Sequence, residues 1–184
     1  MTHLPSITTS GASPTPLAGA PPASDPASML ATFLATSGID AAIIAPGVPM
    51  PTVPLAAAAI GVSPEAILKS VLFRDRNGAF VLAIARGPSR FDVARLATVA
   101  GLGALRLADA PTVLAVTGYP VGGVPPVGHR GQVQTVLDSR AAALPIAYGG
   151  GGAPDLLLRI QPLDVVRLTG ATVAAITRED QGTP

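Results

Sequence analysis

Residues 67–85, ILKSVLFRDRNGAFVLAIA, form the stretch that decides the fold. Within it, Ser70–Asp75 and Ala79–Ala85 are rich in Val, Leu, Ile and Phe, a composition typical of β-strands. Asn77-Gly78 between them is a strong hairpin signal, because Asn and Gly tolerate the positive φ angles of tight turns. We therefore expect a β-hairpin, with Lys69 immediately before its first strand.

On both sides of the hairpin, helical and strand-like segments alternate irregularly. We expect helices from Asp25 to Gly38, Thr52 to Gly61, Phe91 to Ala100, Asp109 to Gly118, Ser139 to Ala143 and Pro162 to Leu168. We expect further strands at Ile39–Ala45, Ala104–Leu107, Thr135–Leu137, Ile146–Tyr148, Leu156–Ile160 and Thr172–Ile176, and a four-glycine loop at Gly149–Gly152. This order predicts an α/β (α+β) fold, with a mixed β-sheet or partial barrel flanked by helices.

The length of 184 residues is typical of a single domain. Residues 1–24 are rich in Pro, Ser, Thr and Ala without periodicity, which predicts a disordered tail. We expect the folded domain at residues 25–178 and a polar C-terminal tail at residues 179–184.

Composition excludes several classes of function. The chain has no cysteine and only two histidines, His3 in the predicted tail and His129, so we expect neither disulfides nor a metal site. The net charge of +1 argues for local rather than extensive contact with nucleic acid. The uncharged stretches 41–64 and 110–128 each contain several prolines, which would break a membrane-spanning helix. We expect a soluble, cytoplasmic protein that makes no membrane contact.

Lys69 is the one lysine among 12 Lys and Arg residues. Its compact ammonium differs from a guanidinium in hydration, in flexibility and in how readily its pKa shifts. A charge beside a buried strand needs a partner or a function. Lys69 is therefore a candidate functional residue, although chance survival of one lysine in an arginine-rich chain explains its presence equally well.

Residues 118–128, GYPVGGVPPVG, combine flexible glycines with rigid prolines. Glycine lets backbone N–H groups approach a ligand closely, and proline fixes the path of the chain. Such a loop is able to bind an ester carbonyl or an oxyanion through backbone amides, although an ordinary surface turn is the alternative. The motif of a phosphate-binding P-loop is absent from the chain.

Asp138 directly follows the predicted strand Thr135–Leu137. Capping the short helix that begins at Ser139 is its expected role, and lining a site next to Lys69 is the alternative. The sequence contains neither a G-x-S-x-G motif nor paired carboxylates. If the chain is an enzyme, we expect it to act by positioning and electrostatics.

Three blocks resemble the YbaK/aminoacyl-tRNA-synthetase-associated family, which includes free-standing prolyl-tRNA editing proteins and the editing insertion of bacterial prolyl-tRNA synthetases. The first is residues 67–73, ILKSVLF, and the second, the most specific, is residues 117–128, TGYPVGGVPPVG. The third is residues 136–138, VLD, followed by the glycine run and the strand-like residues 156–160. Together the blocks span much of the chain outside the N-terminal tail.

The resemblance implies a YbaK-like fold and hydrolysis of the ester of mischarged aminoacyl-tRNA, without a cofactor. The family's essential lysine falls on Lys69, which would contact the acceptor end near the terminal adenosine. The loop Gly122–Pro126 would hold the aminoacyl ester, and a hydroxyl of the terminal ribose would assist in place of a protein nucleophile. The substrate-binding residues expected on this basis are Gly118, Tyr119, Gly122, Gly123, Val124, Pro125, Pro126 and Asp138.

The expected partners are an aminoacyl-tRNA acceptor end, of the tRNA(Pro) type, and an aminoacyl-tRNA synthetase. Arg74, Arg76, Arg86 and Arg90 are candidates for a patch that contacts the acceptor stem, or else a solvated hairpin face. The alternative function is a non-catalytic module of the same fold that binds an aminoacyl group or a tRNA end. His129 is not expected to be catalytic, and the sequence leaves the amino acid, the tRNA and the oligomeric state open.

Overall fold

The computed structural model describes residues 25–178, so the predicted tails at residues 1–24 and 179–184 lie outside the described residues. The helices are α1 (Pro26–Ser37), α2 (Val53–Ile60), the 3₁₀ turn η1 (Pro64–Ala66), α3 (Val93–Ala100), α4 (Ala110–Thr117), α5 (Ser139–Ala142) and α6 (Pro162–Thr169). The strands are β1 (Ala42–Ile44), β2 (Leu68–Arg74), β3 (Phe80–Arg86), β4 (Arg106–Leu107), β5 (Gln134–Asp138), β6 (Ala147–Gly150), β7 (Leu157–Ile160) and β8 (Thr172–Ala174).

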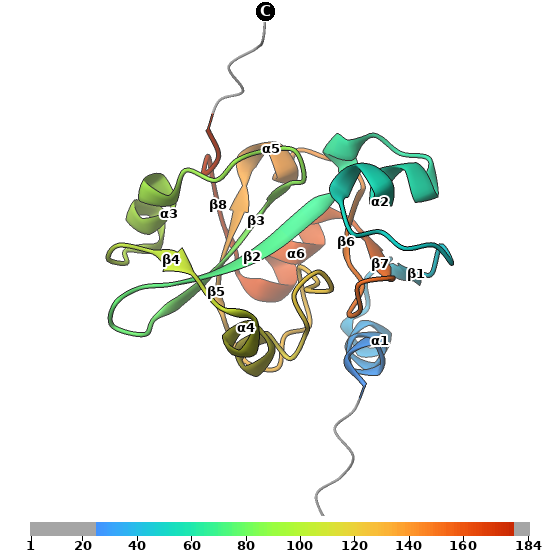
Figure 1. The fold of residues 1–184 in the computed structure, drawn as a ribbon, viewed down its shortest axis with the longest axis horizontal. Coiled ribbons are helices and arrows are strands. Elements are labelled where there is room, and N and C mark those ends of the chain that lie inside the picture. The colour runs from blue at the N-terminus through green and yellow to red at the C-terminus, as the bar shows by residue number, and fades with distance from the viewer. Residues whose placement is uncertain (1–24, 179–184) are drawn as a thin grey trace, which may run out of the picture.

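The strands form two sheets (Figure 1). The larger has the order β4-β2-β3-β5-β8, in which β2 runs antiparallel to β3 and β4 while β5 runs parallel to β3 and β8. The smaller is an antiparallel sheet of order β1-β7-β6. An isolated bridge between Ile67 and Tyr148 joins them. The predicted mixed α/β fold with flanking helices is thus confirmed.

The predicted hairpin is present as β2 and β3, with one shift in its boundary. The strand begins at Leu68, so Lys69 lies inside β2 and pairs with Ala85 rather than preceding the strand. Successive residues of a strand point to opposite faces. Leu68 and Leu72 therefore point to one face of the sheet, and Lys69 and Phe73 point to the other.

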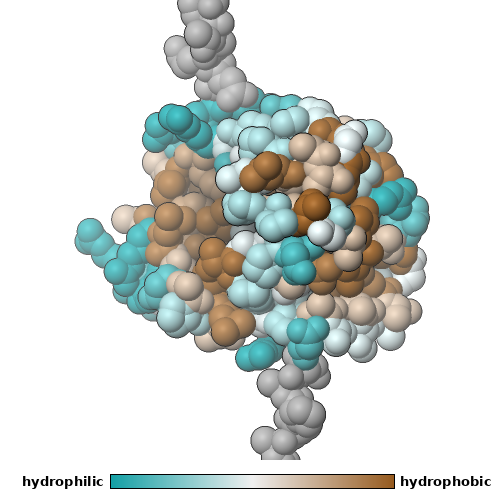
Figure 2. Space-filling view, turned by 45° about the vertical axis from the view of Figure 1, so that its right-hand side comes forward, coloured by the Kyte–Doolittle hydropathy of each residue, from teal (hydrophilic) through white to brown (hydrophobic). Residues whose placement is uncertain are grey.

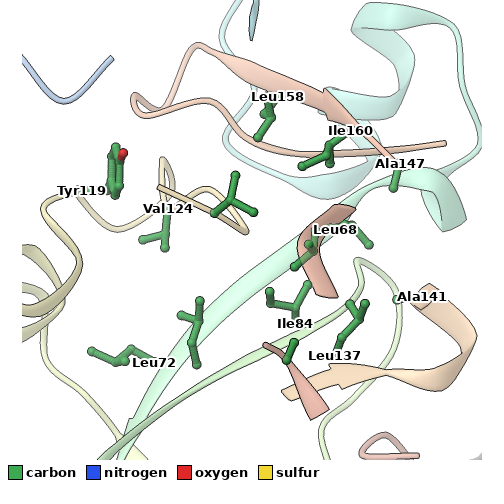
Figure 3. Packing of buried hydrophobic residues seen from close by; sticks show 14 of the residues in the cluster. Leu68, Leu72, Ile84, Tyr119, Val124, Leu137, Ala141, Ala147, Leu158 and Ile160 are labelled. Atoms are coloured by element: carbon green, nitrogen blue, oxygen red, sulfur yellow. The ribbon is translucent and has the colours of Figure 1, made fainter. Parts of the chain in front are cut away.

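Each face of the large sheet buries its own apolar cluster. The first face packs against helices α1, α4, α5 and α6, and its strand residues include Leu72, Leu82 and Leu137. Figure 3 shows side chains from this face and from the smaller sheet directed into the same apolar space. The opposite face packs mainly against α3, through Leu96 and Ala100. Burying one large aliphatic side chain contributes about 1.5–3 kcal/mol, so these aliphatic clusters hold the fold although aromatic residues are few.

Local signals in the sequence set most element ends. Thr52, Asp109 and Asp138 accept hydrogen bonds from the first turn of the helices that follow them, which agrees with the helix starts expected at Thr52 and Asp109 and with the capping role expected of Asp138. Several predicted strands are shorter than expected, and the helix predicted from Phe91 begins at Val93 after the cap Asp92. Gly149 and Gly150 belong to β6, so the predicted four-glycine loop is wrong at these two positions.

Among residues 25–178, no helix is both long and apolar enough to cross a bilayer. The side that carries α2 and the smaller sheet in Figure 1 is turned toward the viewer in Figure 2, where apolar and polar residues intermingle on the surface. This side also contains the cavity described next, because α2, β2, β6 and β7 all contribute to its lining.

Candidate functional site

A cavity of about 300 Å³ lies beside the first half of β2, which β4 does not cover, and is also lined by residues of the smaller sheet. Its lining is mostly apolar and includes Met50, Val53, Ala56, Val71, Leu156 and Leu157. Only three lining residues have polar side chains, Thr52, Lys69 and Ser70. Lys69 is therefore the single charged side chain in the described lining.

The Lys69 ammonium is held by one turn of the chain, residues 87–91. Its Nζ donates hydrogen bonds to the carbonyl oxygen of Gly87, at 3.0 Å, and to that of Ser89. The ring of Phe91 faces the same nitrogen, with its centroid 5.3 Å away. Partial burial lowers the pKa of Lys69 below its usual 10.5, because burial disfavours the charged form.

Two contacts connect the start of this turn to the segment just before β2, which contains η1 and Ile67. The Gly87 N–H donates to the carbonyl oxygen of Ile67 at 2.7 Å, and Arg86 forms an ion pair with Glu65 at 2.7 Å. A Cβ atom at Gly87 would lie 2.4 Å from Cγ1 of Val53, so only glycine fits there without movement. The turn is therefore packed closely enough to position the carbonyl groups that hold Lys69.

The predicted loop at residues 118–128 forms the opposite wall, but its residues have different roles. Gly118 ends α4 with a φ of +85°. Tyr119 is fully buried and donates from its hydroxyl to the carbonyl oxygen of Gly128 at 2.6 Å; burial raises the pKa of Tyr119 to about 12. His129 lies edge-on to Tyr119 and contacts the carbonyl oxygen of Pro125 at 2.9 Å. These contacts make Gly118 and Tyr119 supports of the loop rather than parts of the cavity.

Gly122 and Val124 are the loop residues of the predicted set that line the cavity. The N–H of Gly123 donates to the carbonyl oxygen of Pro120 at 3.0 Å. Among the described residues, the N–H groups of Gly122 and Val124 have no such partner and remain available. An available N–H beside an apolar cavity is the type of group that binds a carbonyl oxygen or an oxyanion.

The loop packs so closely on the smaller sheet that two other positions accommodate only glycine. A Cβ at Gly150 would lie 2.5 Å from the carbonyl oxygen of Val124, and one at Gly123 would lie 2.9 Å from the backbone of Ala153. Pro126 packs against Gly149, where a Cβ would lie 3.0 Å from Cδ of Pro126. Gly123, Pro125 and Pro126 therefore shape the loop from behind.

Asp138 is fully buried at the end of β5, away from this cavity. Its carboxylate accepts from the N–H groups of Arg140 and Ile176, both at 3.1 Å, and from the Thr177 hydroxyl at 2.9 Å. None of these bonds reaches Lys69, so the structure gives Asp138 the helix-capping role. The predicted site residues thus divide into Lys69, Gly122 and Val124 at the cavity, the supports of the loop, and Asp138 elsewhere.

The four arginines proposed for a tRNA patch do not gather in one place. Arg74 and Arg86 lie at opposite ends of the hairpin, about 20 Å apart along the strands. Arg86 is paired with Glu65, and Arg74 lies across from Arg106 on β4. Within the described part of the chain, no three His, Asp or Glu side chains are placed to hold a metal ion.

The sequence analysis missed the residues that surround Lys69. Gly87 and Ser89 fall between the strand expected to end at Ala85 and the helix expected to begin at Phe91, so the sequence analysis gave them no role. A Gly-Pro-Ser run directly after a buried strand is the signal that predicts a tight turn at this position. The contribution of Met50 and Val53 to the cavity depends on tertiary packing and had no signal in the sequence.

Comparison with known proteins agrees with this geometry. Residues 48–168, which include Lys69, the loop and most of the cavity lining, match the model of the aminoacyl-tRNA editing domain. The chain belongs to the aminoacyl-tRNA editing domain family. The resemblance inferred from the three sequence blocks is thus confirmed.

Individual relatives of this editing domain are found among curated proteins and solved structures. A proline–tRNA ligase of Pelotomaculum thermopropionicum is 33% identical over 104 residues, covering 56% of this chain but only 18% of the ligase. The uncharacterised protein YwhH of Bacillus subtilis is 29% identical over 114 residues, covering 62% of this chain and 72% of YwhH. The crystal structure of a candidate trans-editing enzyme for prolyl-tRNA synthetase has a TM-score of 0.73 at 30% identity, covering 87% of this chain and 99% of that one. The editing domain described here therefore spans less than a fifth of the ligase.

Proposed function

We propose that this editing-domain chain is an aminoacyl-tRNA deacylase that acts in trans on mischarged tRNA of the tRNA(Pro) type. The observation that supports the proposal best is the cavity itself, whose apolar lining includes Lys69 and two loop residues, Gly122 and Val124, with available backbone N–H groups. The similarity to proline–tRNA ligases and to a candidate trans-editing enzyme supports the choice of tRNA. A synthetase is the corresponding protein partner.

In this proposal the two walls of the cavity have separate tasks. Lys69 contacts a phosphate or ribose oxygen of the terminal nucleotide, because an ammonium binds anionic oxygen strongly. The N–H groups of Gly122 and Val124 face the ester carbonyl, on which negative charge develops during hydrolysis. The described lining contains two hydroxyl groups, those of Thr52 and Ser70, and Lys69 forms no hydrogen bond with either of them; in this proposal a hydroxyl of the terminal ribose assists the reaction instead.

The lining also favours a particular kind of amino acid. Met50, Val53, Ala56 and Leu157 are apolar, and no acidic side chain lines the described cavity. A volume of about 300 Å³ is at the lower end of the range for small-molecule sites. We therefore expect a small, uncharged side chain such as that of alanine to be preferred over larger or charged ones.

The test is a deacylation assay with alanyl-, cysteinyl- and seryl-tRNA(Pro), and with prolyl-tRNA(Pro) as the cognate ester. We expect ester loss to be fastest with alanyl-tRNA(Pro), and Lys69→Ala to slow it by about 10²–10³-fold, the range for loss of one preorganised electrostatic contact. Arg167→Ala is the matched control, because it also removes one positive charge but lies on α6, where Arg167 pairs with Asp164 at 3.1 Å. This control is expected to keep the wild-type rate.

If the wild-type chain hydrolyses none of the esters, the deacylase proposal fails. Binding of aminoacyl-tRNA without hydrolysis would then support the alternative, a non-catalytic module that binds an aminoacyl group or a tRNA end. Hydrolysis that is unaffected by Lys69→Ala would remove Lys69 from the mechanism while leaving the activity in place.

A further inference from the structure

The turn at residues 87–91 holds the Lys69 ammonium in a way that leaves part of it free. An ammonium has three N–H donors. Two of them are used by the carbonyl oxygens of Gly87 and Ser89. Among the described residues, the third has no hydrogen-bond acceptor, and Lys69 lines the cavity. Lys69 is thus able to bind a substrate oxygen without giving up either carbonyl.

Phe91 adds a contact that a carbonyl group does not supply. Its ring lies within the range at which an aromatic face attracts a cation, with the centroid 5.3 Å from Nζ. The attraction is electrostatic, between the charge and the face of the ring, so it does not require an N–H to be donated to the ring. The ring also occupies one side of the ammonium and so restricts the direction from which a ligand approaches.

Holding a lysine in one conformation has a direct consequence for binding. A free lysine side chain carries about 2 kcal/mol of rotamer entropy, which must be lost when it fixes a ligand. In this structure the carbonyl groups of the turn and the Phe91 ring restrict that freedom before any ligand arrives. Preorganisation of this kind strengthens the contact that is finally made.

Phe91 has an aromatic neighbour on the same face of the sheet. Its ring packs edge-to-face against Phe73, with centroids 5.7 Å apart, and its backbone forms an isolated bridge with Thr177. Phe73 is buried, lies on β2 and belongs to the same apolar cluster, but no contact links it to the ammonium. The pair therefore offers one aromatic residue that touches Lys69 and a neighbouring one that does not.

We propose that Phe91 is a positioning residue, whose ring, together with the carbonyl groups of Gly87 and Ser89, holds the Lys69 ammonium with one N–H directed to substrate. The use of that N–H rests on the proposed deacylase function. The contacts that hold the Lys69 ammonium do not depend on that function, and they are measurable in the protein without substrate.

The sequence makes that measurement simple, because Lys69 is the one lysine of the chain. Protein labelled with ¹³C,¹⁵N-lysine gives a single side-chain signal, whose titration reports the pKa of Lys69 directly. Removing the ring in Phe91→Leu takes away an attraction for the charged form, so the pKa of Lys69 should fall further below 10.5. Phe73→Leu removes the same aromatic pair but keeps an apolar side chain against Phe91, so the Phe91 ring stays beside Nζ and the pKa of Lys69 should keep its wild-type value.

Deacylation of alanyl-tRNA(Pro) is then measured on the same variants. We expect Phe91→Leu to lower kcat/KM by about 3–30-fold, the range for loss of a cation–π contact, and Phe91→Tyr to restore it. We expect Phe73→Leu to stay within about twofold of wild type after correction for folded fraction. Thermal unfolding of each variant supplies that correction.

Equal Lys69 titration curves in wild type and Phe91→Leu would overturn the proposal, whatever the activities. So would equal losses of kcat/KM in Phe91→Leu and Phe73→Leu, since both would then be effects of core packing. If the wild-type protein is inactive but the pKa of Lys69 differs clearly between wild type and Phe91→Leu, the positioning role of Phe91 stands and the deacylase function is refuted.

Discussion

Lys69 and Asp138 lie on the same sheet, two strands apart, and both are charged residues on apolar strands. Asp138 is fully buried, and the three donors to its carboxylate all come from α5 or the chain after β8. Lys69 is partly exposed, is held by two carbonyl groups of one turn, and borders a cavity. A buried charged group whose hydrogen bonds are all made within the protein stabilises the fold. A charged group beside a cavity that still has an unused hydrogen-bond donor is able to bind a ligand.

Among the variants that test this comparison, Asp138→Asn is expected to have the largest effect, a loss of stability. The amide places an N–H₂ group where one carboxylate oxygen now accepts hydrogen bonds, so buried donors lose their partner. We expect the free energy of unfolding to fall by about 3–5 kcal/mol, as for other broken buried charge networks. Urea unfolding measures this change, and the deacylation rate per folded molecule should stay at the wild-type value.

Lys69→Ala is the control for that result, because the opposite pattern is expected. Lys69 and Gly87 are only partly buried, so solvent is able to replace the ammonium at the Gly87 carbonyl group, and removing Lys69 should change the free energy of unfolding by about 1 kcal/mol, less than Asp138→Asn. A variant of Asp138 that is stable but inactive would contradict the assignment of Asp138 to the fold.

A second, smaller effect sharpens the comparison at the turn itself. In Gly87→Ala the new Cβ would lie 2.4 Å from Cγ1 of Val53, so the turn has to move. We expect a loss of about 1–3 kcal/mol in the free energy of unfolding, typical of overpacking, and at least a tenfold loss of kcat/KM because the groups that hold Lys69 are displaced. Urea unfolding and the deacylation assay measure the two effects.

Gly103→Ala is the matched variant, since its Cβ would have its nearest neighbour 3.9 Å away, on the side chain of Asp75. It should keep both stability and activity near the wild-type values. Equal behaviour of the two alanine variants would mean that the turn tolerates displacement and does not position Lys69.

The sequence predicted those parts of the molecule that depend on local signals. The hairpin followed from Asn77-Gly78 and the apolar runs beside it, two helix starts followed from Thr52 and Asp109, and the cap of α5 followed from Asp138. The choice of Lys69 and of the loop as candidate site residues came from the resemblance and from residue usage, and their role stays a prediction. All of these signals lie within a few consecutive residues.

What the sequence did not predict arises from contacts between distant segments. The turn at residues 87–91 reaches Lys69 across 18 and 20 positions of the chain, and Val53 meets Gly87 from α2. Gly149 and Gly150 were expected in a loop because glycine is frequent there, but they form part of β6, where Gly150 accommodates the close approach of Val124. The separation of Asp138 from the cavity likewise depends on where β8 and the chain after it return to the sheet.

The smallest expected effect is a difference in how stability depends on pH. The pKa of Lys69 is lowered in the folded protein by burial, while the unfolded chain has the usual value of 10.5. Between these two values the unfolded chain binds more protons than the folded one, so stability rises as the pH rises through the window. Lys69→Ala lacks this contribution, and groups shared by both proteins, such as Tyr119 with its raised pKa, cancel in the difference. We therefore expect the free energy of unfolding of wild type, measured relative to Lys69→Ala in urea at several pH values from 7 upward, to increase toward pH 10.5. Parallel curves would show that Lys69 is as well solvated as in the unfolded chain, and the contrast with the buried carboxylate of Asp138 would then rest on hydrogen bonding alone.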